Sequence, residues 1–206
     1  MTHYFKNDNT LKSEFRKLIY KYEDWNFIFT SDLGVFSKDK IDFASRLLIE
    51  NYFKFGESNK KVLDVGCGYG LIGVTLSKIK KCNVTMIDIN KRALHLAKMN
   101  LKDNGVTAEV IESDIYENIN DKYDCIITNP PIRAGKKVYM SILENAKEHL
   151  TENGQLWFVM NKDHGVKTVK KELERTYDLQ ILEKNKGFFA IICKKRWLLT
   201  FLLIKF

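Results

Sequence analysis

Short apolar runs alternate with amphipathic stretches from Lys61 onward. Five of the runs are apolar through most of their length, as expected of strands that are buried on both faces of a sheet. They are KVLDVG (61–66), VTMIDI (84–89), AEVIES (108–113), YDCIIT (123–128) and QLWFVMN (155–161). Between and after them, apolar residues recur at helical spacing, which predicts helices over residues 71–79, 91–104, 137–150 and 166–177.

The last two apolar runs, LQILEK (179–184) and FFAIICK (188–194), are separated only by residues 185–187. This connection is too short for a crossover helix, so we expect a hairpin whose last strand runs antiparallel to its neighbour. Together with the earlier runs, the hairpin predicts an α/β fold with a doubly wound, mostly parallel, seven-stranded sheet.

The two ends of the chain differ from this pattern. FRKLIYKY (15–22) and WNFIFT (25–30) alternate like a small β-meander, and residues 41–53 show helical spacing. No Pro/Gly/Ser-rich linker follows, so we expect residues 1–30 to be a β extension packed on the sheet of a domain over residues 31–196. The apolar tail, residues 197–206, is shorter than the roughly 20 residues of a membrane-spanning helix, and we expect it to pack against the domain.

Composition indicates the size class and the charge of the protein but does not identify its partner. The 206 residues suit a single domain, and 34 Lys plus Arg against 26 Asp plus Glu give a net charge of +8. That excess fits either a nucleic-acid partner or a solvated lysine-rich surface. The polar start is unlike a signal peptide, which leads us to expect a cytoplasmic protein with reduced, mostly buried thiols and no membrane partner. No metal site is expected, because Cys67, Cys82, Cys125 and Cys193 lie far apart without zinc-binding spacing.

Candidate chemistry begins in VLDVGCGYGLIG (62–73), where glycines alternate between a strand and a helix. Gly66, Gly68 and Gly70 would let a ligand approach bare backbone, and the following helix start offers unpaired N–H groups. Gly68, Gly70 and Gly73 also fit the G-x-G-x-x-G fingerprint of dinucleotide-binding enzymes. A nicotinamide-dependent oxidoreductase is therefore one alternative.

Aspartates stand at three strand ends. Asp64 precedes Gly66 by two residues, where its carboxylate would repel a pyrophosphate but could meet a cationic ligand group. Asp88 ends the second strand and could bind both hydroxyls of a ribose, a role that dinucleotide enzymes share. Asp114 ends the third strand and could reach an adenine amino group. It could also cap a helix that begins at Ile115, and the two roles are compatible.

These residues carry a resemblance. D-V-G-C-G-Y-G (64–70), with Asp88 and Asp114, resembles the S-adenosylmethionine site of class I methyltransferases, over about residues 31–194. The resemblance implies a Rossmann-like fold, with the 66–70 backbone against the amino-acid part of the cofactor, Asp88 on its ribose and Asp114 beside its adenine. The implied cofactor-binding residues are Asp64, Gly66, Cys67, Gly68, Gly70, Asp88, Ile89, Asp114, Ile115 and Asn129.

The only two prolines, Pro130 and Pro131, follow Asn129 where the fourth strand ends. They fix φ and remove two N–H donors, so we expect a stiff rim whose carbonyls lack local donors. An amine could donate one N–H to the Asn129 side-chain oxygen and another to the Pro130 carbonyl, with its lone pair aimed at a methyl donor. A simple strand-terminating turn is the alternative.

Asn129, Pro130, Pro131 and Ile132 are similar to the catalytic tetrad of enzymes that methylate amino groups of nucleobases or of protein glutamine. The fourth residue is usually an aromatic that stacks on the target. Ile132 could cover one face of a base only by weaker apolar contact.

NPPIRAGKKVY (129–139) and GVFSKDKIDFASRLL (34–48) are similar to the small-domain methyltransferases, which include bacterial ribosomal RNA guanine-N2 methyltransferases. Phe36, Ser37, Asp42 and Ser45 match a segment that helps wall the active site in that group, and the resemblance implies that Phe36 and Ser37 bind substrate. Arg133, Lys136 and Lys137 follow the prolines, where they could contact RNA phosphates.

We therefore expect an S-adenosylmethionine-dependent N-methyltransferase that modifies an exocyclic amine, with guanine N2 in ribosomal or other structured RNA as the first expectation. A protein (glutamine) or small-molecule N-methyltransferase is the alternative with the same core. The oxidoreductase and a non-catalytic RNA-binding module are alternatives from other classes.

Overall fold

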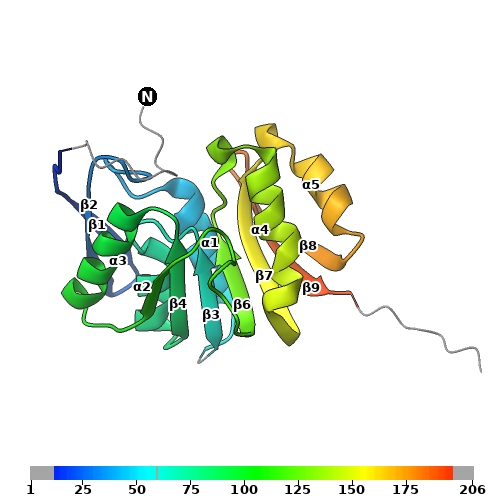
Figure 1. Ribbon diagram of the computed structural model, residues 1–206, viewed down its shortest axis with the longest axis horizontal. Helices are drawn as coiled ribbons and strands as arrows, with labels where there is room; N and C mark the ends of the chain where they lie inside the picture. The colour runs from blue at the N-terminus through cyan, green and yellow to red at the C-terminus, as the bar shows by residue number, and fades with distance from the viewer. Residues whose placement is uncertain (1–11, 59, 197–206) are drawn as a thin grey trace, which may run out of the picture.

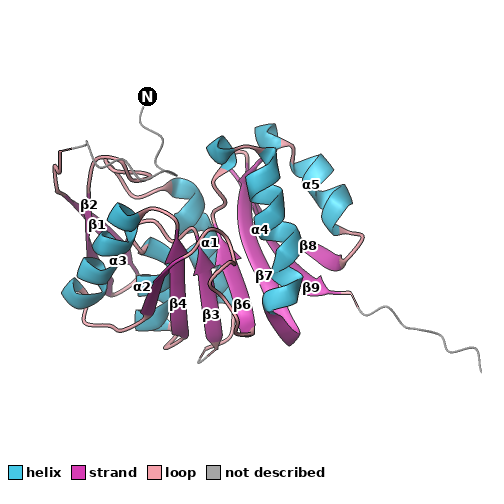
Figure 2. Cartoon of the chain, viewed as in Figure 1, coloured by secondary structure: helices cyan, strands magenta, loops and turns pink. Residues whose placement is uncertain are grey.

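The computed structural model describes residues 12–58 and 60–196 (Figure 1). A seven-stranded sheet crosses the molecule, with strands in the order β5-β4-β3-β6-β7-β9-β8, and a separate two-stranded hairpin lies beside its β4–β5 end (Figure 2). The strands of the large sheet are β3 (Lys61–Val65), β4 (Asn83–Asp88), β5 (Glu109–Glu112), β6 (Tyr123–Thr128), β7 (Leu150–Asn161), β8 (Tyr177–Asn185) and β9 (Phe188–Lys195).

The pairing confirms the predicted fold class. Strands β5, β4, β3, β6 and β7 run parallel, whereas β9 runs antiparallel to both of its neighbours, β7 and β8. The largest differences from the predicted boundaries are at β7 and at the end of the helix before β8. β7 begins at Leu150 instead of Gln155, and the helix before β8 ends at Leu173 because Tyr177 already pairs with Lys195 in the sheet.

Helices cover both faces of the sheet. α1 (Phe43–Phe55), α2 (Leu71–Ile79) and α3 (Lys91–Asp103) share one hydrophobic cluster with the sheet, and α4 (Lys136–His149) and α5 (Val166–Leu173) share the other. Two short 3-10 helices, η1 (Ile132–Ala134) and η2 (Lys162–His164), precede α4 and α5.

The strands read as continuous apolar runs because both of their faces are buried. In β7, Trp157 and Val159 belong to the α1–α3 cluster, whereas Phe158 and Met160 belong to the α4–α5 cluster, and each side chain is at most 1% exposed.

Strand order reverses between β3 and β6. From β3 the chain moves outward through β4 to β5, and from β6 it moves in the opposite direction to β7. The loops that follow β3 and β6 therefore diverge at the carboxyl edge of the sheet, which is where open α/β sheets bind ligands.

The N-terminal hairpin consists of β1 (Arg16–Tyr22) and β2 (Trp25–Ser31). We expected it to pack on the sheet, but it docks on α3. Asn100 Oδ1 accepts from Thr30 N at 2.6 Å while its Nδ2 donates to Thr30 O at 2.9 Å, and Asn104 binds the N–H and C=O of Ile28 in the same way. Asn100 and Asn104 are four residues apart in α3, a rise of about 6 Å that is close to the length of two strand residues, so the two asparagines pair with alternate residues of β2.

The remaining expectations concern the cysteines and the ends of the chain. All four cysteines are free and buried. Within residues 12–58 and 60–196, no helix is both long enough and apolar enough to cross a membrane. The apolar tail, residues 197–206, lies outside the described residues, as do the first eleven residues of the expected β extension.

Candidate active site

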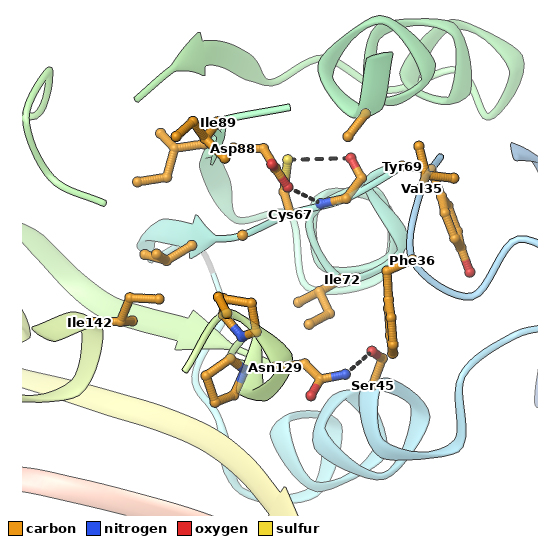
Figure 3. Close-up of a pocket in the computed structure, with 18 of the residues that line it drawn as sticks. Val35, Phe36, Ser45, Cys67, Tyr69, Ile72, Asp88, Ile89, Asn129 and Ile142 are labelled. Atoms are coloured by element: carbon orange, nitrogen blue, oxygen red, sulfur yellow. Dashed lines mark hydrogen bonds between the residues drawn. The ribbon is translucent and has the colours of Figure 1, made fainter. Parts of the chain in front are cut away.

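A cavity of about 350 Å³ opens at the carboxyl edge of the sheet, at the point where the strand order reverses (Figure 3). Its walls come from the segments that follow β3, β4, β5 and β6 and from the segment between β2 and the start of α1. The predicted site residues that line it are Phe36, Gly66, Cys67, Gly68, Asp88, Ile89, Asp114, Ile115, Asn129, Pro130 and Pro131.

The glycine loop presents bare backbone to this cavity. Gly66 and Gly68 have φ of 70° and 56°, and the space that a Cβ atom would occupy at either position is open. The N–H groups of Gly66 and Cys67 both donate to Ile87 O at 2.9 Å, which fixes the turn. A side chain at either glycine would be strained and would project into open space, so the loop fits a ligand that lies directly on the main chain.

The later glycines serve helix packing. Gly70 has φ of 90° at the start of α2, and a Cβ on Gly73 would lie 2.3 Å from Met86 Sδ. Gly73 therefore allows the close approach of α2 to β4. The third glycine of the dinucleotide fingerprint has the same packing role, so Gly73 does not discriminate between a pyrophosphate site and a site for another ligand.

Asp88 is held rigidly at the cavity. Its Oδ2 accepts from Gly68 N at 2.9 Å and its Oδ1 accepts from Asn90 N at 2.8 Å. Burial raises the pKa of this carboxyl group, although backbone hydrogen bonds from Asn90, Gly68 and Ile89 favour its ionised form. An ionised carboxylate can only accept, so this fixed group is suited to hydroxyl groups of a ligand.

Asp64 lies behind the cavity and does not line it. The side chain is fully buried; its Oδ2 accepts from Gly73 N at 3.0 Å, and its Oδ1 has no hydrogen-bond partner among the described residues. Burial, together with the nearby Asp88 charge, raises the pKa of Asp64 to about 7. Asp64 thus anchors the start of α2, and contact with a ligand would require an intermediary.

This buried carboxyl group predicts a pH-dependent stability. The folded protein binds the Asp64 proton more tightly than the unfolded chain, whose carboxyl titrates near the ordinary value of 3.8. Stability from this group is therefore full below about pH 4 and is lost as the pH rises through 7, at about 1.4 kcal/mol per pH unit. We expect Asp64→Asn to gain a few kcal/mol relative to wild type between pH 4 and pH 8 in urea unfolding. A difference that does not change with pH would contradict this interpretation.

Asp114 and Ile115 form a turn, so the helix N-cap expected at Asp114 is wrong. The Asp114 carbonyl accepts from Glu117 N at 3.1 Å, and no helix follows. Ile115 has φ of 52°, a strained conformation for a β-branched residue, and such strain is concentrated at functional sites. Ile115 lines the cavity together with Ile89, which is 37% exposed.

The amide of Asn129 is oriented by two side chains of α1 and its cap. Its Nδ2 donates to Asp42 Oδ2 at 3.0 Å. It also donates to Ser45 Oγ at 2.9 Å (Figure 3). A carboxylate can only accept, so the amide NH₂ must face Asp42 and both of its hydrogens are used. Asn129 Oδ1 is consequently available only as an acceptor, and Asn129 lines the cavity.

The two prolines form an inverse γ-turn. Pro131 has φ of −75° and ψ of 78°, and Ile132 N donates to Pro130 O at 2.8 Å. The Pro131 carbonyl also accepts, from Ala134 N at 2.9 Å. The expectation that these carbonyls lack local donors was therefore wrong, because the chain turns back within two residues. Pro130 O still keeps one lone pair for a ligand.

Several predicted substrate residues lie outside the cavity. Ile132 packs against the α4–α5 cluster, and Ser37 Oγ donates to Lys40 O at 2.5 Å. Arg133 is exposed on η1, while Lys136 and Lys137 line a shallow groove between α4 and α5 in which Lys136 pairs with Glu172 at 3.1 Å.

The sequence did not assign roles to Asp42 and Ser45, although it matched them to a family segment. A local pattern could have indicated that these two residues lie together. Asp42 is the N-cap of α1 and accepts from Ser45 N at 2.7 Å, so the two side chains emerge together at the helix start. Their contact with Asn129 joins segments more than 80 residues apart and could not be inferred from spacing.

Comparison with known proteins identifies the family. The family profile described as "Methyltransferase small domain" matches residues 26–192. The chain belongs to this family. It is therefore an S-adenosylmethionine-dependent methyltransferase, and the oxidoreductase alternative is excluded.

The small-domain relatives differ in length. The Bacillus subtilis protein YbxB, itself uncharacterized, is 41% identical over 198 residues, which are 94% of this chain and 98% of YbxB. "Ribosomal RNA small subunit methyltransferase C" of Buchnera aphidicola is 40% identical over 157 residues, which are 73% of this chain but 46% of that protein. This small-domain protein thus matches about half the length of the ribosomal RNA enzyme.

The solved structures include a similar domain with its ligands. The T. thermophilus 16S rRNA N2 methyltransferase RsmC, in complex with AdoMet and guanosine, superimposes with a TM-score of 0.81 at 25% identity, covering 90% of this chain and 52% of that chain. The cavity of this small-domain protein fits such a cofactor, because Gly66 and Gly68 form an open backbone cradle beside the fixed carboxylate of Asp88.

Proposed function

We propose that this methyltransferase modifies an exocyclic amine, and specifically guanine N2 in ribosomal or other structured RNA. The observation that carries the proposal is the amide of Asn129: Asp42 and Ser45 occupy both of its hydrogens, which leaves Oδ1 as an acceptor at the cavity. A planar NH₂ group can donate one N–H to this acceptor and the other to a neighbouring acceptor. A hydroxyl group has only one hydrogen to donate, and a carbon nucleophile has no such donor.

Asn129 and Pro130 act together on the target. Asn129 Oδ1 accepts one N–H of the amine and Pro130 O accepts the other with its remaining lone pair, so the nitrogen lone pair points away from both oxygens. When bound, S-adenosylmethionine supplies an electrophilic methyl group on a positively charged sulfur. The protein residues need only hold the amine in line and exclude water, and no strong general base is required.

The walls of the same cavity supply the residues that bind the cofactor. The backbone around Gly66 and Gly68 lies against the amino-acid part, Asp88 accepts from the ribose hydroxyls, and Ile89 and Ile115 cover the adenine beside Asp114. Exposed apolar side chains at a cavity rim are those that a planar ligand would bury, as Ile89 illustrates.

Two features support RNA over a protein substrate. The net charge of +8 suits a polyanion, and Arg133 and Lys137 stand beside the tetrad at the start of α4, where Lys136 is paired with Glu172. The ribosomal RNA methyltransferases among the relatives point to the same substrate class. Phe36 lines the cavity and is 38% exposed, so an aromatic ring is present for a planar target of either kind although Ile132 turns away from the cavity.

Label transfer tests this proposal directly. Purified protein is incubated with S-adenosylmethionine labelled at the methyl group, together with total RNA or with total protein. We expect the label in RNA and none above background in the protein fraction. Label found in protein glutamine, with none in RNA, would replace the proposal by its main alternative.

The orientation of Asn129 gives a second prediction. Ser45→Ala removes one of the two acceptors that hold the amide and leaves the Asp42 cap in place, so we expect a roughly tenfold lower kcat with unchanged affinity for S-adenosylmethionine. Ser45→Thr, which keeps the hydroxyl, should restore most of the rate.

A matched control is Ser77→Ala, which removes a buried helical serine whose hydroxyl has no partner among the described residues. It should leave kcat within twofold of wild type. Equal losses for Ser45→Ala and Ser77→Ala would assign Ser45 a merely structural role.

A further inference from the structure

A group of cations and aromatic rings lies at the same sheet edge as the cavity but outside it. Three exposed lysines (Lys162, Lys184 and Lys186) and two half-buried rings (Phe43 and Phe188) come from η2, the β8–β9 turn and the start of α1. We call these five residues the turn cluster.

Strand register places the turn cluster beside the tetrad. Thr128 at the end of β6 pairs with Phe158, and β7 continues to Asn161, which pairs with Phe188 at the start of β9. Two strand spacings amount to about 10 Å across the sheet, and Asn161 lies about another 10 Å along β7 beyond Phe158. The first residue of α1, Phe43, directly follows Asp42, which holds Asn129.

The cluster is held together by defined contacts. Lys186 Nζ lies 5.0 Å from the centroid of the Phe43 ring, whose centroid is 5.7 Å from that of Phe188. Lys162 N donates to Gly187 O at 2.8 Å, and the Lys162 stem lies against Gly187. Lys162, Lys186 and the two rings therefore form one continuous surface. Lys184 lies on the α4–α5 side of the same turn, with its Nζ 5.3 Å from the centroid of the Phe189 ring.

The charges of this surface are not neutralised in the way that Lys136 is by Glu172. Among the described residues, no ion pair joins Lys162, Lys184 or Lys186 to a carboxylate within 4.0 Å. The carboxylate next to Lys184, Glu183, is engaged by Lys54 and Asn51 instead. Asp163 follows Lys162 and is exposed.

We propose that the turn cluster binds the RNA strand that flanks the target nucleotide. The three ammonium groups contact phosphates of this strand around the end of the turn, and Phe43 and Phe188 contact the sugar or base next to the target. This inference rests on the proposed function and extends it, because the cluster lies on the β9 side of the tetrad whereas Arg133, Lys136 and Lys137 lie on the α4 side. Unpaired cations beside aromatic rings suit a strand that offers both phosphates and planar bases.

The test removes the charges without disturbing the backbone. The variant carries Lys162→Gln, Lys184→Gln and Lys186→Asn; asparagine is chosen because Lys186 has φ of 47°, which asparagine tolerates. A fluorescent RNA stem-loop with unpaired guanines is titrated at about 50 mM and about 200 mM salt. We expect Kd for RNA to rise at least tenfold and the salt slope to fall by about 2, with affinity for S-adenosylmethionine within twofold of wild type.

The matched control replaces three exposed lysines of β1 and α3, with Lys21→Gln, Lys98→Gln and Lys102→Gln. It should change Kd for RNA by less than threefold. If the two triple variants change Kd for RNA equally, the effect comes from general surface charge and not from the turn cluster, and the inference is wrong.

The inference and the proposed function fail in different ways. If the turn-cluster variant keeps the RNA affinity and salt slope of wild type and still transfers label to RNA, the turn cluster does not bind RNA. The proposed function is then retained. If label is transferred only to protein, the proposed function is wrong. Weaker binding of an acidic protein substrate by the variant would then show that the turn cluster binds that protein.

Discussion

The Asn129→Ala variant is expected to lose at least a hundredfold in kcat for methyl transfer, while its affinity for S-adenosylmethionine stays within a few-fold of wild type. The substitution removes the oriented acceptor for one N–H of the target amine and leaves the glycine loop and Asp88 untouched. Each factor of ten corresponds to about 1.4 kcal/mol in the barrier, so the loss corresponds to about 3 kcal/mol from misaligned nucleophile and lost hydrogen bonding.

Two measurements separate these effects. Single-turnover kinetics report the chemical step, and calorimetric titration reports cofactor affinity. As the converse variant, Asp88→Ala should weaken cofactor binding strongly and affect the chemical step less once the cofactor is saturating. Comparable loss of cofactor affinity in both variants would show that Asn129 holds the cofactor and not the amine.

The Asn100→Ala variant is expected to lose about 4 kcal/mol in the free energy of unfolding. Asn100 is fully buried and binds three backbone groups: Thr30 N at 2.6 Å, Thr30 O at 2.9 Å and Tyr69 O at 2.8 Å. Alanine would leave all three without that partner and would open a cavity, and each buried unpaired group costs about 1–3 kcal/mol.

Urea unfolding measures this loss, and Asn145→Ala is the control because Asn145 is an exposed helical asparagine that binds only Ser141 Oγ among the described residues. The control should change stability by less than about 0.5 kcal/mol. Since Tyr69 belongs to the glycine loop, Asn100→Ala should also weaken cofactor binding at temperatures where the variant is folded. A loss of less than 1 kcal/mol would show that the hairpin docks on α3 mainly through its apolar side chains.

The sheet could be predicted from the sequence because its strands are buried on both faces. β6 is apolar from Cys125 to Ile127, and the adjacent turn signals set its ends to within a residue. β7 was predicted five residues too short, because Glu152 and Gly154 interrupt its apolar pattern while the backbone still pairs with Tyr123 through Leu150. Docking of the hairpin on α3 was missed because helical asparagines usually indicate solvent or caps, not partners for a strand.

The sequence predicted those parts of the site in which a single residue type at a strand end indicates its role. It did not predict the parts that form where segments far apart in the sequence come together. Asp88 and the glycine loop follow from strand ends and backbone freedom. The orientation of Asn129 depends on Asp42 and Ser45, which reach it only after α1 packs against the sheet. The turn of Ile132 away from the cavity also required the structure, because the γ-turn at Pro131 sets its direction.

Identification of the methylated atom tests the central claim most directly. RNA methylated by the purified protein is digested to nucleosides, and mass spectrometry with authentic standards locates the new methyl group. Methylation of an exocyclic amine, with N2-methylguanosine as the product and none formed by Asn129→Ala, is the predicted result. A methyl group on a ring carbon or a ribose hydroxyl would contradict the role assigned to Asn129 and Pro130.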